Sequence, residues 1–179
     1  MARRADTVSA EARRSVIEAR LPSHQWPERD LKITAIDADS GELVIFDRDS
    51  GVDLVDAVAA SCAVPGIWPT VAIGTHRFMD GGVQSAANIS LARTCRRVIV
   101  LAPSQQPGPN LLGGSLGAEA EGLTKSLVHI IFADEASVDA FGVNPLDPST
   151  RLASAMAGRA QGAQEAMVLA EFLGITAPH

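Results

Sequence analysis

The segment HRFMDGGVQSAANIS, residues 76–90, holds the residue types in this sequence best suited to chemistry. A lead-in with strand character ends in Asp80, and Gly81 and Gly82 follow directly. A rigid strand end can aim a carboxylate, and glycines without side chains let another segment approach it closely. This arrangement suits a general base that takes a proton from a hydroxyl. An Asp-Gly pair is also a common surface turn, so the triplet alone leaves both interpretations open.

A second candidate is Ser115, because Gly113-Gly114-Ser115-Leu116-Gly117 matches the nucleophile pattern GxSxG. A nucleophile elbow needs a strand that runs straight into a sharp turn and then a helix. Ser115 instead follows SQQPGPNLL, a stretch rich in turn-forming residues. We therefore keep Ser115 as an alternative nucleophile and expect a flexible loop that caps the next helix.

The remaining polar residues give weaker signals. The four histidines lack the spacing of metal ligands, and the four aspartates between positions 37 and 49 flank expected turns, so neither a metal nor a cofactor is expected. His76 is predicted to be an exposed hairpin residue. Gln84 and Asn88 follow the aspartate, where they could orient Asp80 or cap the segment ISLARTC. Both alternatives stay open.

The composition narrows the class of function. The chain has 179 residues, 46% of them hydrophobic, which fits one domain with a single core. A formal net charge of −6 and the absence of Tyr speak against nucleic acid as a partner. No apolar run approaches the roughly 20 residues of a membrane span, and the N-terminus does not resemble a secretory signal. We expect a cytoplasmic protein, with a peripheral position at membranes left open.

The two cysteines, Cys62 and Cys95, are too few for a disulfide framework and lack the CxxC spacing. Both are expected to be ordinary small, buried residues in a reducing compartment.

Periodicity and helix-breaking residues predict the elements of the first half. Residues 8–21 predict an amphipathic helix that ends before Pro22. Residues 31–47 predict a β-hairpin around Asp39-Ser40-Gly41, because a tight turn needs the positive φ that glycine supplies. Residues 50–66 predict a buried helix that begins near Asp53 and is apolar on nearly all sides. Residues 70–80 predict a second hairpin.

The second half is predicted to place helices around a buried strand. The run RRVIVLAP, residues 96–103, has no alternation of polar and apolar residues, which indicates a strand covered on both faces. Apolar residues at three-to-four spacing predict a helical segment over 117–142 and another helix over 149–174. The expected architecture is an α/β sandwich.

Four segments in this order resemble the C-terminal part of the patatin-like phospholipase family. ITAIDADSGE is similar to the family's T-A-x-D-x-x-T-G-E segment, and ASCAVPGIWP to its pattern A-S-x-A-x-P-G-x-[FW]-P. The triplet Asp80-Gly81-Gly82 stands where the family has D-G-[GA]. RRVIVLAP and NPLDPSTRLASAMAGRAQG extend the resemblance, which covers residues 31–173.

The resemblance implies an α/β fold, a three-layer patatin-like hydrolase sandwich with a mixed sheet, here incomplete. Residues 1–30 would be an N-terminal helix and loop, and residues 31–179 the C-terminal part of the domain. The implied activity is hydrolysis of lipid esters by a Ser-Asp dyad, with Asp80 as the base and without a metal or organic cofactor. The implied partner is a lipid or ester substrate.

The sequence departs from the family in one respect. The family's Gly-rich oxyanion loop and its GxSxG nucleophile precede the segments found here, and neither pattern occurs between Met1 and Gly41. We therefore expect the chain to be inactive alone, as a truncated frame, a fragment, or a partner of a separately encoded N-terminal half. Whether it is itself an enzyme is left open. The alternative function is a non-catalytic lipid-binding or protein-interaction module derived from this fold.

Overall fold

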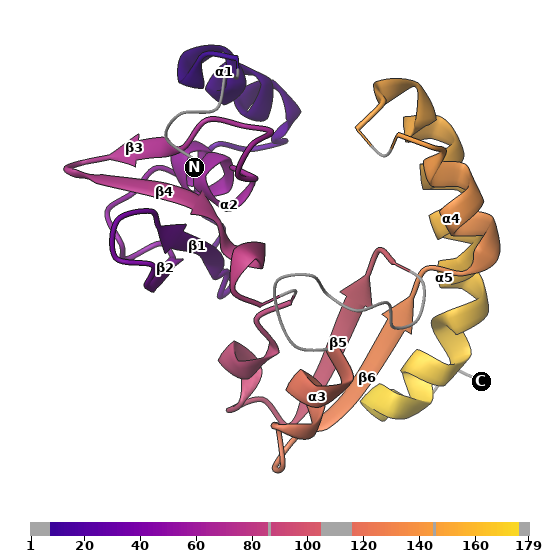
Figure 1. Cartoon of the computed structure of the whole chain (residues 1–179). Coiled ribbons are helices and arrows are strands. Elements are labelled where there is room, and N and C mark those ends of the chain that lie inside the picture. Colours follow the sequence, from indigo (N-terminus) through magenta and orange to yellow (C-terminus); the bar gives the residue numbers. More distant parts are fainter. Residues whose placement is uncertain (1–7, 86, 105–115, 145, 176–179) are drawn as a thin grey trace. The chain divides into compact units, whose positions relative to one another are not determined.

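A computed structural model describes residues 8–85, 87–104, 116–144 and 146–175 (Figure 1). These residues form two compact units. Described residues up to Asn88 belong to the first unit, and those from Ile89 onward belong to the second. Each unit has its own sheet and its own hydrophobic core.

The first unit is built on an antiparallel four-stranded sheet. Its strands are β1 (Ile33–Asp37), β2 (Leu43–Phe46), β3 (Val71–Ile73) and β4 (His76–Asp80), in the spatial order β2-β1-β4-β3. The β1–β2 and β3–β4 hairpins are both confirmed. Gly41 and Gly74 have φ angles of 75° and 60° in the two turns, a conformation that side chains disfavour.

Helix α2 (Leu54–Ser61) packs against this sheet and closes the first core. Ala57 and Ala60 are fully buried beside Phe46 and Phe78 of the sheet. The two phenylalanine rings meet edge to face, with centroids 5.1 Å apart. The prediction of a buried helix in this segment is therefore confirmed, and its small side chains let it approach the sheet closely.

The second unit contains the parallel strand pair β5 (Arg97–Ala102) and β6 (Leu127–Phe132). Its helices are α3 (Leu116–Glu121), α4 (Glu135–Phe141) and α5 (Arg151–Leu173), and the last of these confirms the helix predicted over 149–174. Short 3-10 turns complete the described chain at Gly81–Val83, Ile89–Ala92 and Pro148–Thr150. The protein is thus an α/β protein whose described residues form two sheets.

The prediction that residues 117–142 are largely helical was wrong. The structure divides this stretch into α3, β6 and α4. The middle segment LVHIIF pairs along its whole length with β5, from Leu127 beside Arg97 to Phe132 beside Ala102. The apolar spacing of this segment allows either a helix or a strand. Its β-branched residues favour a strand, and pairing with β5 stabilises that strand.

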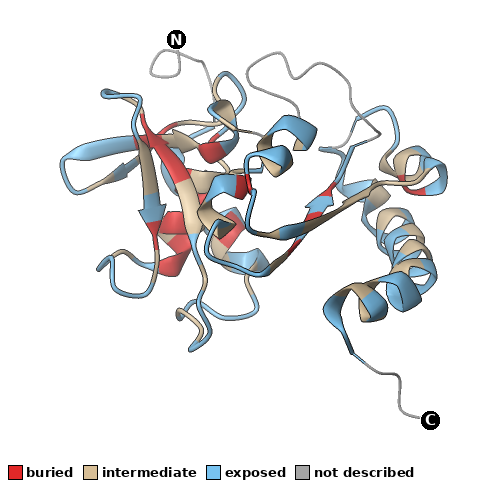
Figure 2. Ribbon diagram, turned by 90° about the horizontal axis from the view of Figure 1, so that it is seen from below, coloured by how far each residue is buried: buried red, intermediate tan, exposed pale blue. Residues whose placement is uncertain are grey.

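The prediction that β5 is covered on both faces was also wrong. Val98, Val100 and Ala102 are buried, whereas Ile99 and Leu101 are 36% and 74% exposed. Helix α5 has no buried residue along its length (Figure 2). The run of apolar residues therefore marks a strand with one buried face within its unit.

Cys95 is exposed, contrary to the expectation of a buried residue, and Cys62 is partly buried. Both are free thiols.

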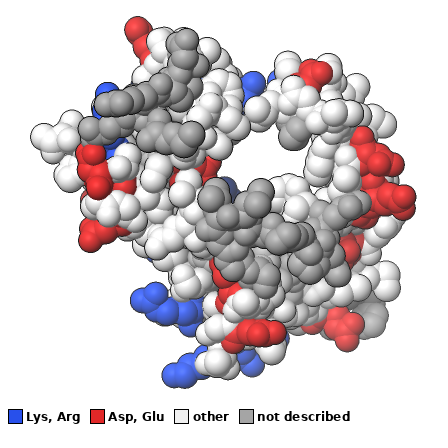
Figure 3. All heavy atoms as spheres, in the orientation of Figure 1, with Lys and Arg blue, Asp and Glu red and all other residues white. Residues whose placement is uncertain are grey.

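Charged side chains on one face of the protein are shown in Figure 3. Lys and Arg of the described residues form small separate groups there, and acidic side chains gather over α4 and α5. No helix within the described ranges is long and apolar enough to cross a membrane. The same residues contain no cluster of three or more His, Cys, Asp or Glu arranged to hold a metal ion.

Candidate active site

The backbone of Asp80 is fixed from two sides. Asp80 is the last residue of β4, where it lies opposite Ala35 of β1. Its N–H donates to the carbonyl of Ala63, just after α2, at 3.1 Å. Since Ala35 and Ala63 are both buried, these contacts hold the residue against the first core. The strand end predicted from the sequence therefore places this carboxylate on a rigid support.

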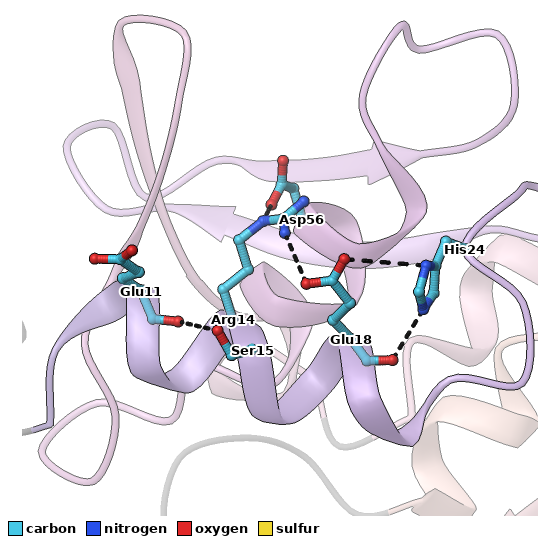
Figure 4. Close-up of polar contacts among 6 residues, drawn as sticks. All are labelled: Glu11, Arg14, Ser15, Glu18, His24 and Asp56. Atoms are coloured by element: carbon cyan, nitrogen blue, oxygen red, sulfur yellow. Dashed lines mark hydrogen bonds and ion pairs between the residues drawn. The ribbon is translucent and has the colours of Figure 1, made fainter.

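Helix α1 (Ala10–Arg20) packs against α2 (Figure 4). Ile17 is buried beside Val55 and Ala59. Arg14 donates from Nε to a carboxylate oxygen of Asp56 at 2.6 Å, a partly exposed contact of small energetic weight. The apolar contact is thus the main link between α1 and the helix that precedes Ala63.

Gly81 lies where only a glycine fits. A Cβ at this position would come within 2.4 Å of Thr34 Oγ1, 2.7 Å of the Thr34 carbonyl oxygen and 2.9 Å of its carbonyl carbon. Two of these atoms belong to the backbone of β1 and cannot swing aside. The glycine after the aspartate therefore allows the chain to turn directly against the neighbouring strand.

Gly82 acts on the carboxylate itself. Its N–H donates to Asp80 Oδ1 at 2.7 Å, which caps the 3-10 turn that begins after Asp80. A Cβ on Gly82 would lie 2.9 Å from the same oxygen. Within the described part of the chain, Asp80 Oδ2 has no hydrogen-bond partner. One oxygen is therefore held in place while the other is open to a further group.

The electrostatic setting favours proton uptake by this carboxylate. Burial raises the pKa of Asp80, and the hydrogen bond from Gly82 opposes the rise only in part. Burial, followed by the charge of Asp80, also raises the pKa of the neighbouring Cys62 thiol. Cys62 is therefore protonated at neutral pH and does not supply a thiolate nucleophile beside Asp80.

Asn88 holds the turn that follows the aspartate. Its side-chain amide donates to the carbonyls of Gly81 and Ser85 at 3.3 Å each, and to Thr34 Oγ1 at 3.4 Å. Its own φ of 50° is unusual for a residue other than glycine. Of the two roles left open for Asn88, these contacts favour support of the Asp80 turn. No side-chain hydrogen bond of Gln84 occurs within the described ranges.

Thr34 was missed by the sequence analysis although it lies under Gly81 and contacts Asn88. No local pattern marks this residue, because its contacts come from segments more than forty residues away. Ser115, the alternative nucleophile, lies outside the described residues.

His76 does not take part in the Asp80 site. It lies at the opposite end of β4 and is exposed, as predicted, and its Nδ1 lies 2.7 Å from Asp37 Oδ2. The backbone N–H groups of Ser40 and Asp39, and then the His76 ring, lower the pKa of Asp37 to about 2. Asp37 thus secures the first hairpin.

The lowered pKa of Asp37 predicts loss of stability in acid. Its contribution to the free energy of unfolding is fully present above the unfolded value of about 3.9 and is lost as the pH falls toward about 2. Asp37→Asn should lower stability at pH 7 and flatten this acid dependence. Fluorescence-detected urea unfolding is the measurement, since Trp26 and Trp68 both lie in the first unit. Asp49→Asn, in the exposed turn after β2, is the control and should keep the wild-type pH dependence.

The fold and this site define an α/β domain with an aspartate at a strand end, partly buried and followed by a glycine pair. Residues 5–93 match the family model of patatin-like phospholipases, and this part of the chain is a patatin-like phospholipase domain. The match includes α1, all four strands of the first sheet, and the triplet at 80–82. Among curated proteins, none matches the chain.

Proposed function

We propose that this chain is the C-terminal part of a lipid acyl hydrolase that works by a Ser-Asp dyad. Asp80 is its base, and lipid esters are its substrates. The same proposal includes the family's fold, a three-layer hydrolase sandwich with a mixed sheet. The observation that carries it is the Asp80 carboxylate, with one oxygen held by Gly82 and the other open, in a patatin-like phospholipase domain.

In this mechanism Asp80 accepts and then releases a proton in each of two half-reactions, acylation and deacylation. The open carboxylate oxygen accepts the proton of a serine hydroxyl as the serine oxygen attacks the ester carbonyl carbon. The ester C–O bond then breaks, the alcohol leaves with the proton from Asp80, and an acyl-enzyme remains. Water attacks the acyl group next, gives its proton to Asp80, and the fatty acid departs as the serine regains that proton. The raised pKa of Asp80 suits both directions of transfer.

The serine is proposed to come from a segment outside the present sequence, because no GxSxG pattern precedes Asp80. The donors that stabilise the oxyanion would come from the same segment. That segment could be joined to this chain in one reading frame or encoded as a second polypeptide, and reading the DNA upstream of Met1 distinguishes the two. No step of this mechanism needs a metal or organic cofactor.

The chain alone should show no covalent labelling by a fluorophosphonate probe, and no turnover of short-chain p-nitrophenyl esters. Without a positioned serine, Asp80 has no hydroxyl proton to take, and loss of the nucleophile leaves only a small fraction of enzymatic catalysis. In-gel fluorescence and mass spectrometry measure the labelling. A known serine esterase in the same gel checks the probe.

Labelling at Ser115 would contradict this expectation and assign the nucleophile to the present chain. Labelling that Ser115→Ala abolishes, together with matching loss of ester turnover, would establish that assignment. If the chain supplemented with the upstream segment binds lipid vesicles but shows no turnover, the proposed hydrolase is wrong. The non-catalytic lipid-binding function would then replace it.

A further inference from the structure

The second unit contains a cavity of about 490 Å³ between β5, β6, α4 and α5. The volume falls within the range of small-molecule sites, roughly 300–1,000 Å³. Large apolar side chains from all four elements contribute to its wall: Leu101, Ile131, Phe141 and Leu169. Leu101 is 74% exposed although it belongs to a central apolar run, so the sheet face beside the cavity lacks a protein cover within this unit.

Two contacts hold the α5 wall of the cavity in place. The Gln161 amide donates from Nε2 to the Phe132 carbonyl at 2.7 Å, and its Oε1 accepts from Asp134 N and Ser137 Oγ at 3.1 and 3.0 Å. Nearer the end of α5, the ring of Phe172 lies 5.4 Å from that of His129. These contacts fix α5 to β6 and α4, so the wall that α5 contributes to the cavity is held in place.

On either side of Gln161 in the chain, α5 presents glycines to the cavity. Gly158 and Gly162 are one helical turn apart, and both line the cavity. A Cβ built on either one meets no atom within 4 Å. Glycine weakens a helix relative to alanine, so these residues reduce helix stability where larger side chains would fill the space. Both glycines are themselves exposed, so at these two positions α5 leaves the wall of the cavity without side chains.

The chemistry of the wall selects an apolar occupant. The Ser137 hydroxyl donates to the Gln161 amide oxygen, and the Gln161 amide nitrogen donates to the Phe132 carbonyl. The Ser154 hydroxyl donates to the Ala140 carbonyl at 3.1 Å. The charged side chain of the wall is Glu165, and further acidic side chains lie over α4 and α5 on the face drawn in Figure 3. An occupant gains little by hydrogen bonding here, and an anionic group is disfavoured.

We propose that this cavity binds the hydrocarbon chain of a lipid whose head group is uncharged or zwitterionic. The choice of a lipid over other apolar molecules rests on the proposed function, whereas the cavity and its chemistry do not. Burial of each chain methylene against Leu101, Ile131 and Leu169 supplies the affinity. The site lies in the second unit, beyond the residues that match the patatin-like phospholipase family.

The test uses the full chain and the methyl ester of cis-parinaric acid, a neutral probe whose fluorescence rises in apolar surroundings. Wild type should bind it saturably. Gly158→Leu/Gly162→Leu should bind it about tenfold more weakly or worse, because two leucine side chains project into the cavity and take up part of the space for the ligand. The matched control, Ala160→Leu/Ala163→Leu, adds leucines to exposed positions of the same helix and should bind as wild type does.

Equal binding by the glycine variant and wild type, or no binding by wild type, would overturn the proposal. Circular dichroism melting must show that the glycine variant is folded; if it is not, Gly162→Leu alone is tested with Ala163→Leu as its control. A wild-type dimer that the glycine variant converts to a monomer would assign the cavity to a second copy and also overturn the lipid site. Because binding is measured without turnover, failure of the Asp80 mechanism leaves this result unchanged.

Discussion

Replacing Asp80 with asparagine should lower the esterase rate of the nucleophile-bearing protein by about a hundredfold or more, since general-base catalysis contributes roughly 10² to 10⁴. Asparagine keeps the shape of the side chain, and its amide oxygen can still accept from Gly82. It lacks a carboxylate that can take the serine proton. The measurement is kcat for a short-chain p-nitrophenyl ester, with the upstream segment joined in frame or added in trans.

The matched control for this variant is Asp56→Asn. Asp56 is a partly exposed carboxylate on α2 of the same unit, and its partner is Arg14. This variant should keep kcat within about threefold of wild type, because surface ion pairs contribute little. An active protein in which Asp80→Asn also stays within about threefold would show that Asp80 is only a turn residue.

The pH dependence of kcat/KM gives a second check on the same assignment. Asp80 must be ionised to act as the base, and burial raises its pKa. The rate should therefore fall on the acid side at a pH above the ordinary aspartate value of about 3.9. A rate that stays constant down to this value would contradict the role of Asp80.

Local chemistry accounts for what could be predicted of the first unit. The hairpin at Asp39-Ser40-Gly41 depends on a turn whose glycine must adopt positive φ, and such a requirement is visible in a few residues. The small apolar residues of α2 likewise indicate a buried helix without reference to its neighbours. The strand end at Asp80 follows from the same hairpin logic.

Contacts between distant segments account for what could not be predicted. The segment LVHIIF becomes β6 because it pairs with β5, thirty residues earlier in the chain. Apolar spacing alone cannot distinguish that outcome from a helix. The one-sided burial of β5 depends in the same way on which elements cover it. At the site, Thr34 contacts Gly81 from β1, and only the folded sheet brings these two residues together.

Gly81→Ala should lower the free energy of unfolding of the first unit by about 1–3 kcal/mol, the usual cost of forcing extra volume into a packed region. The added Cβ would lie within 3.0 Å of three Thr34 atoms, two of them in the backbone of β1. Thr34→Ala removes the third, Oγ1, and should therefore restore little of the lost stability. Urea unfolding followed by tryptophan fluorescence reports this unit, which contains Trp26 and Trp68.

Two other glycine variants are compared with Gly81→Ala, because an added Cβ meets different surroundings at each position. Gly82→Ala places its Cβ 2.9 Å from Asp80 Oδ1, a side-chain atom that can move, so it should disturb catalysis more than folding. Gly158→Ala meets no atom within 4 Å and should stabilise α5 by about 0.5–1 kcal/mol. If Gly81→Ala unfolds within about 0.5 kcal/mol of wild type, the turn after Asp80 is not packed against β1. The evidence that Asp80 has a fixed orientation, on which its assignment as the base depends, would then be lost as well.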